Sequence, residues 1–387
     1  RVTNDGAYND GFGTQLAAGL SGVLRVGGTG TTRLVSVDAA SPIDADEFIH
    51  EAGHTLTLLA AGSAPALEVS QTVTNHGVIE VLASVAPITM AGELRNTGEL
   101  RVSGDVDLRA DGGYVNDGLI RVASENDPAR LTLKRSASQF NSRLTSPTGE
   151  GAFAAGAGGT LVVERGLVAS GEEMLFRAES GGTVEFDARR TVRGVANLLI
   201  EDGGTAVLNG VDVIGNVVTG DAELDIVNRG LLRVASGSNV LNDPVDNDDR
   251  IRLLNLDNQE GTVRGEAGAA FFLSATIEDY AGGGATFDAG EWELIGAPAV
   301  FDSRTQAGAL DPDIATVRLS VTGVSADDNF LGEFEFDDEP GFDSAVPGSG
   351  YQIEAFETAL ETNASTVTLR GAAYFPYFNT VRENTGV

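Results

Sequence analysis

Hydrophobic and polar residues alternate in short runs along most of the chain. One segment with the pattern N-x-G-x-[IL]-[ER]-V occurs four times, beginning at Asn75, Asn96, Asn116 and Asn228. In each copy two aliphatic residues flank one charged residue, so a strand would bury the aliphatic side chains on one face and expose the charge on the other. The pattern therefore predicts short strands with one buried face.

The spacing of the copies predicts the architecture. The first three begin 21 and 20 residues apart, and a second motif, Gly-Gly-Thr followed by strand residues, begins at Gly158, Gly181 and Gly203. A repeat of about 20 residues is too short for a propeller blade and too rich in strand residues for a helical solenoid, but it fits one coil of a β-solenoid. We predict an all-β fold, a parallel β-helix with about 20–22 residues per coil.

The asparagine and glycine of each copy are expected to form the turns. Both residues tolerate positive φ, so N-x-G can turn the chain sharply before a strand. If the copies stack in register, Asn75, Asn96 and Asn116 form an internal amide ladder in which each side chain bonds the next coil, and we assign Asn228 to the same role. The buried aliphatic residues, each worth roughly 1.5–3 kcal/mol, are expected to fix the register.

The character of the sequence changes near residue 300. Residues 301–387 hold 11 of the 24 aromatic residues, and the Asn-Gly repeats stop before them. We therefore predict a β-solenoid over residues 1–300. Residues 301–387 are predicted to form an aromatic-rich β cap or small β-sandwich that serves assembly.

The composition restricts the partners. The chain has 57 Asp and Glu against 25 Lys and Arg, a formal net charge of −32, and no cysteine. Such an acidic surface repels nucleic acid and anionic membranes. The lack of cysteine excludes disulfides, thiolate metal sites and cysteine catalysis. Because the sequence begins at Arg1 and has no apolar run that could span a membrane, we expect a secreted and processed chain without membrane insertion.

One segment matches a catalytic motif. His50-Glu51-Ala52-Gly53-His54 fits the H-E-x-x-H pattern of zinc proteases, which needs both histidines one helical turn apart, the glutamate as general base, and a third ligand. A helix is favoured by Ser41-Pro42-Ile43-Asp44, which resembles a capping box with proline at the first helical position.

Other features argue against a zinc site. Thr57 and Ala60 stand where the extended metzincin pattern requires glycine and histidine, and the remaining histidine, His76, lies within an N-x-G turn. The segment from Ala52 to Leu58 also reads as a turn followed by an alternating strand, like the Gly-Gly-Thr repeats. We interpret it as part of the solenoid and expect no zinc-protease activity.

Acidic clusters are candidate calcium sites. Asp243, Asp246, Asp248 and Asp249 fall in one predicted loop, and hard oxygen ligands of this kind suit Ca²⁺, although the spacing is not that of an EF-hand. The alternative is a solvated acidic loop. No phosphate-binding loop, dinucleotide fingerprint or nucleophile elbow occurs, so we predict no other cofactor.

The repeats also resemble a known class of proteins. The N-x-G-x-[IL]-x-V segments and the stretches AGHTLTL and GGTLVV are similar to the strand repeats of secreted bacterial surface proteins, namely autotransporter passengers and filamentous haemagglutinin-like adhesins. The likeness covers about residues 15–300. It implies a β-solenoid at the cell surface or outside the cell.

These observations lead to one expected function and two alternatives. A solenoid exposes unpaired strand edges at its ends, and a polar N-terminal end could join an aromatic C-terminal end in a heterologous contact that repeats into a filament. We expect an extracellular structural protein that assembles head to tail with copies of itself. The alternatives are a monomeric adhesin that binds cell-surface glycans and a polysaccharide-active β-helix enzyme.

Overall fold

The computed structural model describes most of the chain up to residue 241 and short stretches beyond it. The described residues are 2–3, 7–10, 20–36, 44–60, 67–82, 87–125, 127–134, 142–164, 167–169, 174–187, 192–193, 196–209, 212–214, 224–241, 254–257, 261–266, 269–273, 276–277, 291–294, 299–301, 320–321, 362–363 and 383–384. The chain divides into two compact units, Arg1–Phe186 and Asp187–Val387. This boundary was not predicted from the sequence.

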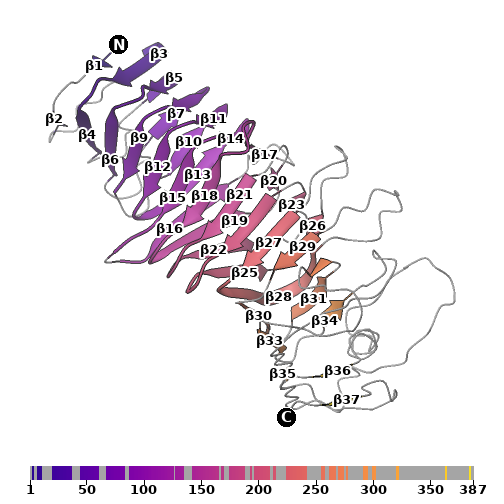
Figure 1. Cartoon of the computed structure of the whole chain (residues 1–387). Coiled ribbons are helices and arrows are strands. Elements are labelled where there is room, and N and C mark those ends of the chain that lie inside the picture. The colour runs from indigo at the N-terminus through magenta and orange to yellow at the C-terminus, as the bar shows by residue number, and fades with distance from the viewer. Residues whose placement is uncertain are drawn as a thin grey trace. The chain divides into compact units, whose positions relative to one another are not determined.

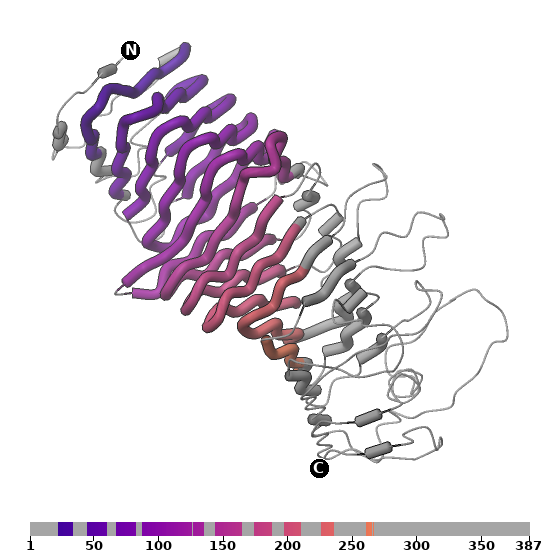
Figure 2. The backbone as a smooth tube through the Cα atoms, viewed as in Figure 1, coloured from indigo at the N-terminus to yellow at the C-terminus, as the bar shows by residue number. Residues whose placement is uncertain are grey.

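The first unit is a solenoid in which the chain passes three faces in each complete coil (Figures 1 and 2). The first face contains the first part of β3 (Leu20–Gly27) and of β5 (Asp44–His50), followed by β7 (Leu67–Val69), β10 (Ile88–Met90), β13 (Asp105–Ala110), β16 (Ala129–Lys134), β19 (Gly159–Glu164) and β22 (Thr183–Asp187). The second contains β1 (Val2–Thr3), the last part of β3 and of β5, β8 (Val73–Asn75), β11 (Glu93–Asn96), β14 (Gly113–Asn116), β17 (Ser142–Thr145) and β20 (Leu167–Ala169). The third contains β2 (Ala7–Asp10), β4 (Thr31–Ser36), β6 (Thr55–Ala60), β9 (Val78–Val81), β12 (Glu99–Val102), β15 (Leu119–Val122), β18 (Ala152–Ala155) and β21 (Met174–Ala178).

The second unit contains further strands of the same kind. They are β23 (Val192–Arg193), β24 (Ala196–Ile200), β25 (Thr205–Asn209), β26 (Asp212–Ile214), β27 (Leu224–Asn228), β28 (Leu231–Leu241), β29 (Leu254–Asp257), β30 (Thr262–Gly265), β31 (Ala269–Leu273), β32 (Thr276–Ile277), β33 (Glu291–Leu294), β34 (Ala299–Phe301), β35 (Ser320–Val321), β36 (Thr362–Asn363) and β37 (Glu383–Asn384). All the described elements in both units are strands, so the predicted all-β solenoid is confirmed. Most of residues 301–387 lie outside the described part, and the predicted cap stays a prediction.

Strands of successive coils pair in parallel and in register. On the third face Leu100 of β12 is paired with Ile79 of β9 and with Ile120 of β15, and the charged neighbour Arg101 is paired with Glu80 and Arg121. The three aliphatic side chains are at most 4% exposed, whereas the charged ones point outward. The predicted alternation is therefore confirmed, and the inward positions of these three strands form apolar columns along the stacking direction.

Backbone conformation and close contact between coils both require glycine in this fold. The first glycine of each Gly-Gly-Thr motif has positive φ, with values of 66° at Gly158, 73° at Gly181 and 74° at Gly203. Gly53 in the AGHTLTL segment also has positive φ, 78°, although its turn joins the second face to the third, whereas the turns at Gly158 and Gly181 join the third face to the first. At these turns the backbone conformation itself favours glycine.

The N-x-G glycines do not have positive φ, so the reason we gave for them from the sequence is wrong. A Cβ atom at Gly98 would collide with the carbonyl oxygen of Gly77, and one at Gly118 would collide with that of Gly98. A Cβ at Gly77 would lie 2.5 Å from the carbonyl oxygen of His54. Glycine is required here because the backbone of the preceding coil fills the space of a side chain.

Two substitutions test whether a glycine is required by close contact between coils or by its backbone conformation. We expect Gly98→Asn to lower the free energy of unfolding by more than about 2 kcal/mol, because the coils must move apart. Gly53→Asn should cost less than about 1 kcal/mol, since asparagine tolerates left-handed φ and the nearest atom to a Cβ there is 3.8 Å away. Urea titration of both variants measures the difference. Equal losses would contradict the explanation from close coil contact.

Candidate functional site: a buried polar chain

The H-E-x-x-H segment lies in a strand, a turn and a second strand. His50 is the last residue of β5, Gly53 lies in the turn, and His54 immediately precedes β6. The helix that a zinc protease requires is therefore not formed here. Both imidazoles point into the solenoid, where His50 is 0% exposed and His54 is 1% exposed.

The two histidines contact each other and two further side chains. His50 Nε2 lies 2.9 Å from His54 Nδ1, and the rings meet edge to face at a centroid separation of 5.2 Å. The other nitrogen of each ring is also engaged. His50 Nδ1 lies 2.7 Å from Asn75 Oδ1, and His54 Nε2 lies 3.0 Å from Thr32 Oγ1. All four ring nitrogens are thus within hydrogen-bond distance of a side chain.

Asparagine side chains continue this chain into the following coils. Asn75 Nδ2 donates to Asn96 Oδ1 over 2.7 Å, and Asn96 Nδ2 donates to Asn116 Oδ1 over 2.8 Å. Asn116 Nδ2 donates to the carbonyl oxygen of Ala152. All three asparagines are 1% exposed, so this ladder satisfies amide groups that would otherwise be buried at a cost.

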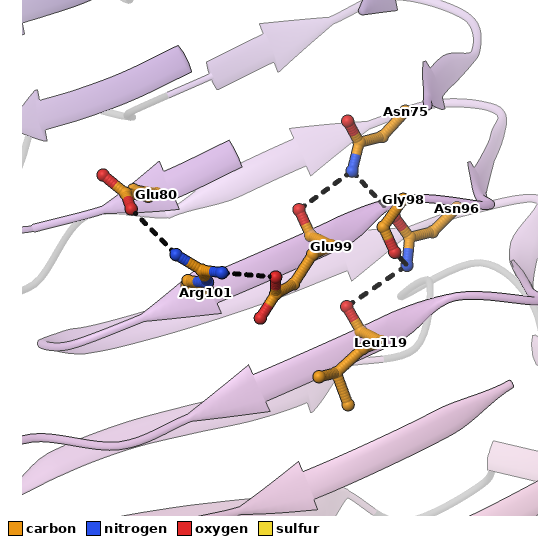
Figure 3. Close-up of polar contacts among 7 residues, drawn as sticks. All are labelled: Asn75, Glu80, Asn96, Gly98, Glu99, Arg101 and Leu119. Carbon is orange, nitrogen blue, oxygen red and sulfur yellow. Dashed lines mark hydrogen bonds and ion pairs between the residues drawn. The ribbon is translucent and has the colours of Figure 1, made fainter. Parts of the chain in front are cut away.

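The ladder also binds the turns and the next strands (Figure 3). Asn75 Nδ2 donates to the carbonyl oxygen of Glu99 over 3.1 Å, and Asn96 Nδ2 donates to that of Leu119 over 3.4 Å. Within its own turn, Asn75 Oδ1 accepts a hydrogen bond from the backbone N–H of Gly77. Each asparagine therefore closes its own turn and ties it to the next coil.

The ladder orientation determines the histidine tautomers. Because Asn75 uses Nδ2 to donate to Asn96, its Oδ1 must accept from His50, which requires a proton on His50 Nδ1. In a neutral His50 ring, Nε2 then accepts, so His54 donates from Nδ1. The remaining nitrogen of neutral His54, Nε2, accepts from the Thr32 hydroxyl. Every donor in this polar chain points in the same direction along the stack.

Burial keeps both histidines neutral. Desolvation lowers the pKa of His50 from 6.5 to about 4, although its hydrogen bond to Asn75 acts in the opposite direction. Desolvation also lowers the pKa of His54, against the attraction of Glu51. Histidines of an unfolded chain titrate near 6.5, so neutral His50 contributes full stability above that pH and loses it as the pH falls toward 4. The lowered pKa of His54 acts in the same direction.

The other predicted site residues are Asn228 and four aspartates. Asn228 lies in the second unit, where its Nδ2 donates to the carbonyl oxygen of Thr262 and its Oδ1 accepts from the N–H of Gly230. The candidate calcium ligands Asp243, Asp246, Asp248 and Asp249 fall outside the described residues. In the part of the chain that the structure describes, no three His, Asp or Glu side chains gather as a metal site.

Charged side chains form pairs on the outer surface. Arg101 lies between Glu80 and Glu99 at 3.3 and 2.7 Å, as Figure 3 shows, and Arg121 contacts Glu179 at 2.6 Å. Arg101 is half exposed, so its pairs contribute at most about 1 kcal/mol. In-register stacking places Arg101 next to Arg121, and these glutamates neutralise the two like charges.

The sequence analysis did not predict the structural roles of two residues. His50 is paired in register with Asn75 and so occupies the ladder position one coil earlier, which its place before a glycine turn could have indicated. The Tyr114 side chain is fully buried, and its hydroxyl lies 2.6 and 2.7 Å from the carbonyl oxygens of Leu108 and Lys134. The pattern of alternation gave no sign of this contact.

Comparisons with known proteins do not identify the chain. No protein-family model matches it, and neither a curated protein nor a solved structure is similar enough to count as a match. The described residues contain no helix of the length and apolar character needed to cross a membrane. The function must therefore be argued from the solenoid and its polar chain.

The ladder can be tested with an isosteric change. Asn96→Asp keeps an acceptor for Asn75 but places a carboxylate oxygen opposite Asn116 Oδ1, so we expect a loss of about 2–4 kcal/mol at pH 7. The buried carboxyl should have a raised pKa, so the loss should shrink at low pH, where its protonated form can donate again. Urea titration at pH 7 and pH 5 measures this. Arg95→Ala, an exposed change on the same strand, is the control. A small, pH-independent loss would contradict the ladder.

Proposed function

We propose that the chain is an extracellular structural protein that assembles head to tail into a surface fibre. The observation that carries the proposal is the parallel, in-register stacking of coils, because the coils that contain Asn75, Asn96 and Asn116 present to one another the same backbone edge and the same interior columns. A further copy that continued this stacking would meet a matching surface. A heterologous contact of this kind repeats without closing.

The N-terminal edge supplies a candidate assembly surface. β1 pairs with β3 and β2 pairs with β4, and the described residues provide no strand on the other side of β1 or β2. Such an edge offers N–H and C=O groups to an added strand. The C-terminal partner surface would lie within residues 301–387, where the sequence concentrates aromatic residues.

The chemistry of the described interior favours a structural role over catalysis. The buried polar side chains of the His–Asn chain bond one another and the backbone, so they stabilise the stack and do not converge on a space for substrate. The net charge of −32 disfavours binding to nucleic acid and anionic membranes. Similarity to the strand repeats of secreted bacterial surface proteins supports an extracellular location.

The assembly proposal predicts filaments. Purified chain at increasing concentration, with and without calcium, should form filaments visible by negative-stain electron microscopy. Isolated monomers under all conditions would contradict the proposal. Saturable binding of such monomers to glycans would favour an adhesin instead.

Paired proline substitutions test the edge. Successive N–H groups along β2 point alternately toward β4 and toward the open side, and proline removes an N–H. One of the pairs Ala7→Pro/Asn9→Pro and Tyr8→Pro/Asp10→Pro should therefore block filament growth about tenfold or more without loss of stability, while the other should destabilise the first coil. If neither pair slows growth, the N-terminal edge is not the assembly surface.

A further inference from the structure

We propose that Thr32, His50, His54 and Asn75 form an acid-sensitive latch that holds residues 20–36 against the coils that follow. The first proton taken up by the histidine pair leaves the latch closed, and the second opens it. The inference goes beyond the proposed fibre and does not depend on it, since the latch acts within a single chain.

The latch lies where the amide ladder ends. On the second face Asn116, Asn96 and Asn75 are followed by His50, and the residue paired with His50 in the preceding coil is Val26. The side-chain polar chain therefore leaves this column and crosses through His54 to Thr32 on β4. Besides the strand pairings of β3 with β5 and β4 with β6, this buried contact joins residues 20–36 to the next coil.

One added proton can be accommodated. It enters at His54 Nε2, and the Thr32 hydroxyl rotates so that its oxygen accepts from this nitrogen over the same 3.0 Å. His54 Nδ1 still donates to His50 Nε2, and His50 Nδ1 still donates to Asn75. All three contacts survive with the heavy atoms unmoved.

A second proton cannot be accommodated in the same geometry. It must enter at His50 Nε2, where it meets the N–H of His54 across 2.9 Å. Two donors then face each other, and two positive charges lie in a site that is closed to water. The rings must separate, and the movement of His54 breaks its contact with Thr32.

The surrounding charges do not offset this repulsion. Glu51 in the turn after β5 raises the pKa of His50 and His54, and His76 after β8 lowers that of His50, but burial outweighs both. On the packed neighbouring strands, Arg25 of β3 and Arg33 of β4 are exposed, and Glu80 of β9 accepts a hydrogen bond from Thr57. The two rings form hydrogen bonds with each other, with Asn75 and with Thr32.

Hydrogen exchange of the full chain locates the effect. After correction for intrinsic rates, we expect the protection of residues 20–36 to fall about tenfold or more between pH 7.5 and pH 4. Residues 105–122, which carry carboxylates but no histidine, should change much less. Equal losses of protection in the two segments, or unchanged protection of residues 20–36, would contradict the proposed latch.

Two variants test whether the histidine pair causes the loss of protection at residues 20–36 in acid. His50→Asn extends the asparagine ladder by one coil and removes the second protonation site, so its protection at 20–36 should not show the acid-induced fall. His76→Asn, at an exposed histidine, should behave as the original chain does. A fall of the same size in His50→Asn would exclude the histidine pair as its cause.

Nitrogen-15 spectra of the original chain provide a test that does not depend on the variants folding. With only three histidines in the chain, the ring signals of His50 and His54 can be assigned. At pH 7.5 both rings should carry their proton on Nδ1, and on acidification His54 should gain its second proton before His50. A proton on Nε2 of either neutral ring, or the opposite order of titration, would overturn the proposal.

Discussion

The structure depends on the close, in-register contact of each coil with the next. At the N-x-G turns the backbone of one coil fills the space where a side chain would stand in the next, and the carbonyl oxygens of Gly77 and Gly98 lie against the following glycines. This contact brings the asparagine amides within 2.7 to 2.8 Å of each other and stacks the aliphatic residues into columns. A single change in coil spacing would disturb all three sets of contacts.

The hydrogen bonds of the buried polar chain all run in one direction because each side chain has a donor at one end and an acceptor at the other. Each asparagine donates toward one neighbour and accepts from the other, so the orientation of one amide determines that of the next. His50 and His54 continue this order only as neutral Nδ1–H tautomers. The ladder thus makes the protonation state of a histidine pair part of the packing of the first coils, and their burial, which lowers the pKa of both rings, maintains it near neutral pH.

Much of the fold could be predicted from the sequence because the same alternation of aliphatic and charged residues occurs in several repeats. The aliphatic residues on either side of Glu80, Arg101 and Arg121 specified strands, buried faces and period, and the third-face pairings follow from them. The role of the glycine in N-x-G could not be predicted, since the sequence of a single repeat does not show how closely the backbones of two coils approach. His50 was missed for a related reason, because its coil is 25 residues from the next ladder position and carries a different polar side chain.

The central claim, in-register stacking of neighbouring coils, can be measured by disulfide formation because the chain has no cysteine of its own. Glu80 and Arg101 are paired directly across two coils, so Glu80→Cys/Arg101→Cys should oxidise almost completely under mild conditions. Glu80→Cys/Glu99→Cys offsets the pair by two residues on the same face and should form little disulfide, since its Cα atoms are too far apart. Equal yields from the two variants, or a higher yield from the offset one, would contradict the register on which the solenoid, the ladder and the latch all depend.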